Sequence, residues 1–204
     1  MKSILISIKP QWVEKILNGE KTIEIRKSKP NVELPCKVYI YCTNGYMLYD
    51  LRNEDYLDLK NNCTLDVTHK SNKYLSSNPP MLNRRVVAEF TLNEISCLPS
   101  IRYKANGAFY QYNKVSDEVL KKSCLTQEQI LNYTNGEDLY AWHIEDLKIY
   151  DKPKELNEFV LPNKKNCKTC FFYKDMCENV CEEIKKHLFR PPQSWCYLKS
   201  LEEE

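Results

Sequence analysis

The segment ISIKPQWVEKILNGEKTIEIRK, residues 6–27, predicts the first three elements of the fold. It continues the apolar run SILISI at 3–8, which is typical of a buried strand. Proline suits the first turn of a helix, where its missing N–H has no intrahelical partner, so Pro10 marks a helix start. Apolar residues then recur at helical spacing until Gly19, a natural helix end. A second strand, KTIEIRK, is expected at 21–27.

The second expected strand alternates polar and apolar residues. Alternation places Thr22, Glu24 and Arg26 on one face, and Lys21 with the two isoleucines on the other. The first set could be a solvent-exposed ion pair without function. It could also be the floor of a site, because Arg and Lys donors bind phosphate or base edges. Glu24 could then accept from an exocyclic amine, or act as a base if burial raised its pKa.

Composition limits the classes of function. The chain has 204 residues, 42% of them hydrophobic, which suits one domain and a small appendage. Its formal net charge is +2, so nucleic-acid binding would have to rest on a local patch. We recognise no secretory segment and no apolar run near the ~18 residues that span a bilayer. A cytoplasmic protein without membrane contact is therefore expected.

The remaining elements follow from periodicity and capping residues. Further strands are expected at 36–43, 84–95 and 139–151, the last of them bulged. Ser116 and Thr126 each begin a short helix, and Thr126 with Gln129 has the spacing of a capping box. Residues 44–83 are weakly patterned and are interpreted as a long insertion. The predicted organisation is a main domain at 1–160 and a Cys-rich tail at 161–204.

The tail contains five of the ten cysteines. A Cys-x-x-Cys turn directs two thiolates at one tetrahedral centre, and two cysteines four apart share a helix face. A small module cannot bury a core alone, so a structural zinc ion held by four thiolates is predicted. The candidate ligands are four of Cys167, Cys170, Cys177, Cys181 and Cys196. Free thiols, an iron–sulfur cluster, and replacement of one thiolate by His187 remain alternatives.

Residues 6–27 resemble the opening of an ASCH domain, a member of the PUA-like superfamily. The resemblance rests on a strand ending in SIKP, a helix ending in NGEKT and a strand containing EIR. YAWHIEDLKIYDKPKEL, at 140–156, resembles the closing strand of longer ASCH proteins, which are often phage- or prophage-borne. RPPQSWCYL, at 190–198, resembles the tail that sometimes follows it. The resemblance implies an α+β fold: a strongly curved PUA-like β-barrel with flanking helices and a cleft beside the first helix.

The resemblance also implies RNA or a nucleotide-like molecule as the ligand of that cleft. Tryptophans can stack on an unpaired base, although a tryptophan on an apolar helix stripe is more often part of a core. The candidate ligand-binding residues are Lys9, Trp12, Lys21, Thr22, Glu24, Arg26 and Trp142. The preferred hypothesis is an RNA- or modified-nucleotide-binding module with a structural zinc tail.

Two other classes of function remain open. In one bacterial branch, similar domains hydrolyse the acetyl amide of acetylated cytidine with a Lys, a Thr and a Glu. Lys21 matches that Lys, but Glu24 stands where the Thr is expected, and Glu89 is a candidate for the third residue. A nucleoside amide hydrolase or nuclease would therefore use Lys21 and Glu24 as its catalytic pair. A phage-encoded protein-interaction factor, with a host protein as its partner, is the other alternative.

Overall fold

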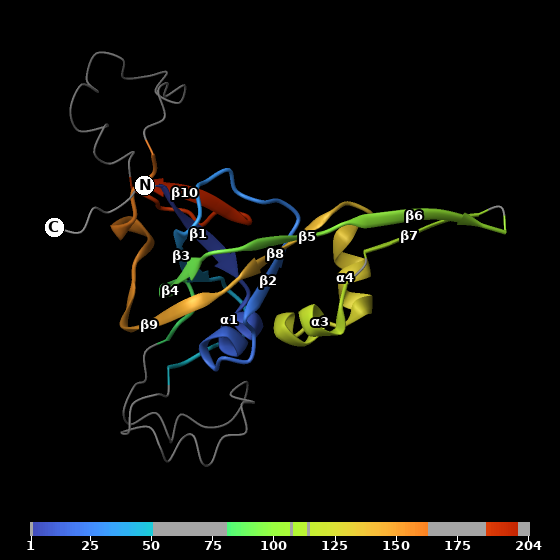
Figure 1. The fold of residues 1–204 in the computed structure, drawn as a ribbon. Coiled ribbons are helices and arrows are strands. Elements are labelled where there is room, and N and C mark those ends of the chain that lie inside the picture. The colour runs from blue at the N-terminus through green and yellow to red at the C-terminus, as the bar shows by residue number, and fades with distance from the viewer. Residues whose placement is uncertain (1, 51–80, 107, 114, 163–186, 200–204) are drawn as a thin grey trace, which may run out of the picture. The chain divides into compact units, whose positions relative to one another are not determined.

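The computed structural model describes residues 2–50, 81–106, 108–113, 115–162 and 187–199 (Figure 1). The helices are α1 (Pro10–Leu17), α3 (Asp117–Ser123), α4 (Gln127–Thr134) and the short 3-10 helix η2 (Leu156–Glu158). The first strands are β1 (Lys2–Ile8), β2 (Ile23–Arg26), β3 (Cys36–Cys42), β4 (Val86–Leu92) and β5 (Ile95–Leu98). The later strands are β6 (Ser100–Ala105), β7 (Ala108–Asn113), β8 (Leu139–His143), β9 (Glu145–Lys154) and β10 (Trp195–Lys199).

A five-stranded sheet has the order β10-β1-β3-β4-β9. Strand β1 pairs in parallel with β3, with Ile6 opposite Ile40, and antiparallel with β10, with Leu5 opposite Cys196. Residues 3–8 of β1 are buried throughout, because a parallel pair inside a sheet is covered on both faces. This burial explains why the run SILISI is continuously apolar.

A three-stranded antiparallel sheet has the order β2-β8-β5, so β2 forms one of its edges. Strands β6 and β7 form a separate hairpin. Helix α4 covers the three-stranded sheet through an apolar cluster to which both elements contribute. Its buried members are Ile23, Ile25, Leu98, Ile130, Leu139 and Ala141.

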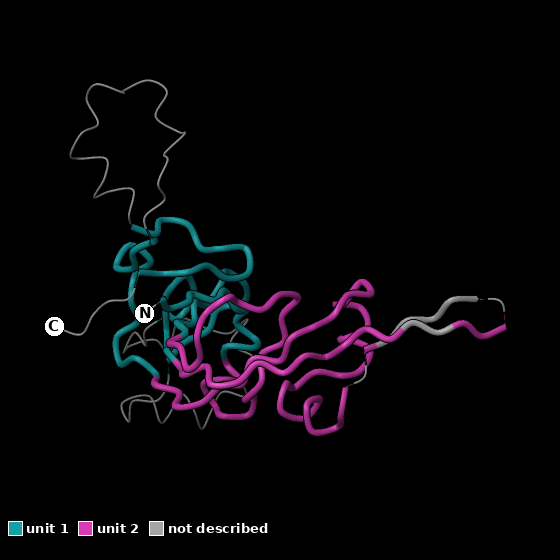
Figure 2. Tube along the Cα trace, turned by 45° about the horizontal axis from the view of Figure 1, so that its top comes forward, with its two compact units in different colours: residues 1–13, 38–89, 149–204 teal, residues 14–37, 90–148 magenta. Residues whose placement is uncertain are grey.

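The chain divides into two compact units, coloured separately in Figure 2. The first unit comprises residues 1–13, 38–89 and 149–204, and the second comprises 14–37 and 90–148. The division falls within α1, β3, β4 and β9. Because β2, β5, β8, α3 and α4 all belong to the second unit, the geometry described below for that unit is internal to it.

The local predictions are confirmed where capping and periodicity were strongest. Helix α1 starts at Pro10 and is followed by Gly19 with φ +75°. The Ser116 side chain accepts from the backbone N–H of Val119 at the start of α3. Thr126 and Gln129 form the expected capping box. The fold is a sheet-dominated α+β arrangement, as predicted.

Other predictions require correction. The single strand expected at 139–151 is two strands with different partners, and Asp146 at φ 48° lies near the start of the second. Strands β5, β6 and β7 were not predicted, since their short segments lack clear alternation. Strand β10 lies in the predicted tail but pairs with β1. The described helices include none long and apolar enough to cross a membrane.

The ends of the predicted insertion at 44–83 lie close together. The Asn83 side chain accepts from the Leu48 N–H at 2.8 Å and donates to the carbonyl of Tyr46 at 2.9 Å. Tyr49 and Met81 form an isolated β-bridge. These contacts fix where the insertion leaves and rejoins the first unit, while residues 51–80 lie outside the described part of the chain.

Candidate functional site

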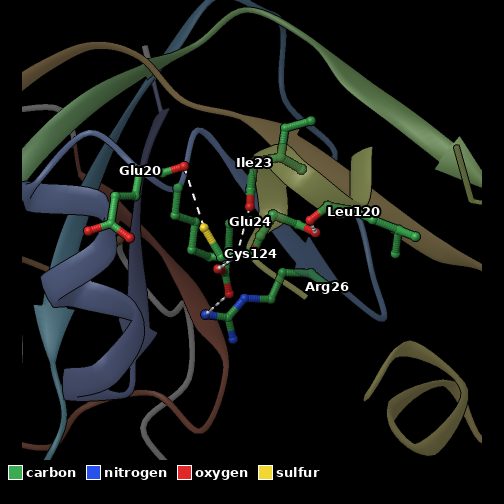
Figure 3. A network of polar contacts seen from close by, with 8 residues as sticks. Glu20, Ile23, Glu24, Arg26, Leu120 and Cys124 are labelled. Atoms are coloured by element: carbon green, nitrogen blue, oxygen red, sulfur yellow. Dashed lines mark hydrogen bonds and ion pairs between the residues drawn. The ribbon is translucent and has the colours of Figure 1, made fainter. Parts of the chain in front are cut away.

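Lys21, Glu24 and Arg26 form a cluster in the second unit, here named the charged cluster. One carboxylate oxygen of Glu24 lies 3.2 Å from Lys21 Nζ, and the other lies 3.1 Å from Arg26 Nη2. Figure 3 shows the guanidinium of Arg26 directed at the Glu24 carboxylate, beside the residues that end α3. One carboxylate therefore bridges two cations, and the three side chains together carry a formal charge of +1.

The charged cluster is buried, which excludes a solvent-exposed ion pair. The exposed fractions of Lys21, Glu24 and Arg26 are 2%, 7% and 8%. All four residues of β2 are buried, so neither face of this strand is left to solvent. Burying charged groups is costly unless they are paired and hydrogen-bonded, and the observed contacts provide that pairing.

The position of Lys21 differs from the one that alternation predicts. Strand β2 begins at Ile23, so the alternation does not extend back to Lys21. The chain instead turns at the end of α1, where the backbone N–H groups of Glu20 and Lys21 both donate to the Lys15 carbonyl. That turn lets the Lys21 side chain reach the carboxylate of Glu24, which was predicted to lie on the opposite face.

The ammonium group of Lys21 makes contacts in three directions. Lys21 Nζ donates to the carbonyl of Ser123 at 2.7 Å and to the carbonyl of Ile23 at 2.8 Å, in addition to its ion pair with Glu24. A lysine ammonium has three donors, so these contacts match its capacity. Lys21 thus ties the start of β2 to the end of α3 and holds the carboxylate of Glu24 in place.

Two pairs, each of an exposed lysine and a tyrosine, lie near Arg26. Lys27 Nζ lies 5.0 Å from the ring centre of Tyr133 on α4, and Lys29 Nζ lies 5.8 Å from the ring centre of Tyr140 on β8. Tyr140 is the cross-strand partner of Arg26. Burial raises the pKa of Tyr133, while the positive charge of Arg26 opposes that rise.

Sequence reasoning missed Lys27, Lys29, Tyr133 and Tyr140 as a group. The run RKSK at 26–29 is a visible basic signal. The two tyrosines, however, come from segments far along the chain, and only the β2–β8 pairing and the packing of α4 bring them to it.

Two predicted ligand-binding residues of the second unit do not join the charged cluster. Trp142 is fully buried on β8 opposite Glu24, so it offers no exposed face to a base, and this burial does not support its predicted stacking role. Thr22 is exposed, and its backbone joins Lys122 and Ile144 by hydrogen bonds of 2.9 Å.

Lys9 and Trp12 belong to the first compact unit, outside the unit that holds the charged cluster. Lys9 is exposed and its carbonyl accepts from the backbone N–H of Trp12, which is half-buried on α1. Their predicted role in ligand binding stays a prediction.

Glu89, the candidate third residue of the hydrolase hypothesis, lies at the end of the first unit's segment 38–89, and its catalytic role stays a prediction. In the first unit, its carboxylate accepts a 2.5 Å hydrogen bond from the hydroxyl of Tyr150. Burial, followed by this contact with Glu89, raises the pKa of Tyr150 well above its ordinary value. Tyr150 belongs to a buried apolar cluster, so the pair stabilises the core of that unit.

His143 on β8 contacts Ser96 on β5, which the sequence did not reveal. Ser96 Oγ lies 2.9 Å from His143 Nε2 and donates to Glu94 at 2.8 Å. The Glu94 carboxylate is itself 3.9 Å from the same ring nitrogen. In a nucleophilic triad the carboxylate orients the imidazole through the other nitrogen, so this geometry does not match one.

The cysteine prediction falls mainly outside the described residues. Cys167, Cys170, Cys177 and Cys181 lie there, whereas Cys196 is partly buried on β10 and packs against the apolar cluster of the first unit. His187 Nδ1 is 2.5 Å from the Asn157 carbonyl. Among the residues that the structure places, no group of three or more His, Cys, Asp or Glu side chains is arranged to hold a metal. The structural zinc ion stays a prediction.

Comparisons with known proteins give similarity in structure alone. No family model matches the chain, and no curated protein matches it. A crystal structure of ASCH from Zymomonas mobilis is similar at a TM-score of 0.49 and 17% identity, covering 97% of this chain and 88% of that one. A single-substitution variant of the same Zymomonas mobilis protein is similar at 0.48 and 17%, covering 98% and 92%.

Proposed function

We propose that this protein binds RNA or a nucleotide-like anionic ligand at the surface of its second unit, beside the charged cluster. The observation that carries the proposal is a guanidinium fixed by a carboxylate, with two exposed lysines directly after it. Glu24 holds Arg26 at 3.1 Å, and Lys27 and Lys29 follow at the end of β2. Binding groups held in place before the ligand arrives lose less freedom on association.

The charge distribution supports an anion as the ligand. The chain is nearly neutral overall, at +2, so it has no general attraction for nucleic acid. The charged cluster adds +1 beneath the surface, and Lys27 and Lys29 add two exposed ammonium groups beside it. Ammonium groups bind phosphate as point charges, and the buried positive charge of Arg26 adds to their attraction for an anion.

The contacts favour binding over catalysis by Lys21 and Glu24. A lysine base or nucleophile needs a free lone pair, but Lys21 Nζ donates to two carbonyls and pairs with Glu24. Each oxygen of the Glu24 carboxylate faces a cation. In the proposed module, both residues position Arg26. Turnover of acylated nucleosides or RNA that is lost in Glu24→Gln, with the fold intact, would instead favour the enzyme hypothesis.

For the tail, a structural zinc ion remains part of the proposal, on the basis of cysteine spacing. The test is the metal content of the purified full chain, compared with that of a Cys167→Ser/Cys170→Ser variant. About one zinc per chain, lost in the variant, is expected. Absence of metal from freshly purified wild-type protein would remove zinc from the proposal.

The binding test is filter retention of a mixed cellular RNA pool across a salt series. We expect wild-type retention to fall with salt, and Lys27→Gln/Lys29→Gln to lower affinity about 10-fold or more and flatten the salt slope by about 0.7 per lost phosphate contact. The matched control is Lys121→Gln/Lys148→Gln, which removes two exposed lysines elsewhere in the same unit. Equal retention by both double variants would place binding elsewhere, and no retention at low salt would reject RNA.

Lys21→Ala is a poor probe of binding, despite the family resemblance at that residue. Lys21 is 2% exposed and joins β2 to α3, so its removal disturbs the fold before it removes a ligand contact. Exposed Lys27 and Lys29 avoid this difficulty, because each ammonium lies near a tyrosine ring at the surface.

A further inference from the structure

The two lysine–tyrosine pairs beside Arg26 resemble each other in composition and geometry. Each pair places an exposed ammonium between 5.0 and 5.8 Å from the centre of a tyrosine ring. A nucleotide offers one phosphate and one base, and a lysine beside an aromatic ring offers a partner to each. Aromatic stacking of this kind tolerates any base, because every base has a π-face.

The pairs also follow one another along the chain. Lys27 and Lys29 are two residues apart, so their Cα atoms are separated by no more than about 7 Å. Tyr140 is the direct cross-strand neighbour of Arg26, and Tyr133 is close enough for the charge of Arg26 to act on its hydroxyl. Arg26 is therefore near both tyrosines, and we take the two lysine–tyrosine pairs to be neighbours on one surface.

Both rings retain exposed area. Tyr133 is 38% exposed, and Tyr140 is partly exposed. In contrast, Trp142 on the same strand is fully buried. The two tyrosines, rather than Trp142, are thus placed where a base could reach their rings and stack on them.

From these observations we infer that the surface formed by Lys27, Tyr133, Lys29 and Tyr140 binds a single-stranded polynucleotide, with one lysine–tyrosine pair for each of two neighbouring nucleotides. This inference rests on the proposed function, and it specifies the ligand as a strand rather than a free mononucleotide or a duplex. A duplex is disfavoured because its bases are stacked on one another and cannot reach the tyrosines.

The test measures affinity of the full chain for fluorescein-labelled oligouridines of one, two, four and eight nucleotides, with oligodeoxythymidines and a duplex RNA beside them. Affinity is expected to rise between one and a few nucleotides and to be weaker for the duplex. Tyr133→Leu and Tyr140→Leu are each expected to weaken binding of the four-nucleotide strand about 5- to 150-fold. Tyr133→Phe and Tyr140→Phe, which keep the ring, should retain wild-type affinity within about threefold.

The matched control is Tyr197→Leu. Tyr197 forms the same kind of pair with Lys2, at 5.4 Å, but in the first unit, so its loss should leave strand affinity unchanged. Circular dichroism melting of each variant separates loss of binding from loss of fold. Comparison of ribose and deoxyribose strands identifies which polynucleotide is preferred.

The outcomes separate a failure of this inference from a failure of the proposed function. Folded Leu variants that bind the strand like wild type would overturn the stacking inference, even if the lysine double variant has lost affinity. Mononucleotide and strand binding of equal strength would also overturn it, while leaving the proposed nucleotide binding intact. No binding of any oligonucleotide by wild-type protein would overturn both.

Discussion

Two lysine–glutamate pairs lie within ten residues of each other and differ mainly in their surroundings. Lys15 and Glu20 are 3.0 Å apart with side chains 39% and 53% exposed. Lys21 and Glu24 are 3.2 Å apart with side chains 2% and 9% exposed. The similar distances show that separation alone does not decide what a charge pair does, because water screens the first pair and not the second.

The partners of the two pairs differ as well. The Lys15–Glu20 pair raises the pKa of Lys15, chiefly through the hydrogen bond between the two side chains. The Lys21–Glu24 pair adds backbone carbonyls from β2 and from the end of α3, and a second cation in Arg26. The exposed pair is a local surface contact, whereas the buried one joins elements that are distant in sequence.

Among the substitutions that test this comparison, Glu24→Gln should cause the largest loss of stability. It leaves the ammonium of Lys21 and the guanidinium of Arg26 buried without the carboxylate between them. Loss of one partner of a buried ion pair costs about 3–5 kcal/mol, so the free energy of unfolding in urea should fall by that amount. Glu20→Gln is the control, and an equal loss in both variants would contradict the importance of burial.

Lys21→Met should have the next largest effect. Glu24 keeps Arg26 as a partner, but the carbonyl of Ser123 loses its donor at 2.7 Å. A decrease of about 2–3 kcal/mol in the free energy of unfolding is expected, measured in the same urea titration. In the Lys21→Met/Glu24→Gln double variant, the decrease in the free energy of unfolding should differ from the sum of the two single decreases, because the two residues contact each other. Strict additivity would mean that the ion pair contributes nothing.

Cys36 extends the comparison to a residue that is about as buried as Glu24 and whose pKa shift is caused by burial. Burial raises the pKa of the Cys36 thiol from 9.0 to about 11. Its folded-state pKa lies above the unfolded one, so its contribution to stability is complete below pH 9 and is lost as pH rises through about 11. The stability of wild type relative to Cys36→Ala should therefore decline over that interval in urea titrations. A pH-independent difference would contradict the burial effect.

Lys15→Gln should have the smallest effect. The Lys15–Glu20 pair is exposed, so salt screens it. We expect the midpoint of thermal unfolding of Lys15→Gln to match that of wild type at about 1 M NaCl and to differ little from it at low salt. The shift caused by Glu24→Gln should persist at both salt concentrations. A salt-sensitive shift in the buried pair would show that water reaches the charged cluster.

Features that depend on interactions within a few residues were predicted from the sequence, whereas features that depend on distant segments were not. Pro10, Gly19, Ser116 and Thr126 act on their own helix ends, so the sequence was sufficient to place those boundaries. The strand at 139–151 was predicted as one element because its split into β8 and β9 depends on which strands pair with each part. No local pattern specifies a choice of partner strand.

The candidate site shows the same division. Alternation along KTIEIRK predicted that Glu24 and Arg26 share a face, and the two side chains do contact each other. The basic run at 26–29 is visible in the sequence. The sequence could not show that Lys21 bonds the end of α3, that Trp142 is buried, or that Tyr133 and Tyr140 lie beside Lys27 and Lys29.

By itself, the sequence determined the helix ends, the first strands and the presence of a charged segment, because these depend on neighbours a few residues apart. The tertiary structure decided that the charges of β2 are buried rather than solvated and which aromatic rings accompany them. Burial and cross-strand contact depend on segments more than a hundred residues away in the chain, as the Lys21–Ser123 hydrogen bond shows.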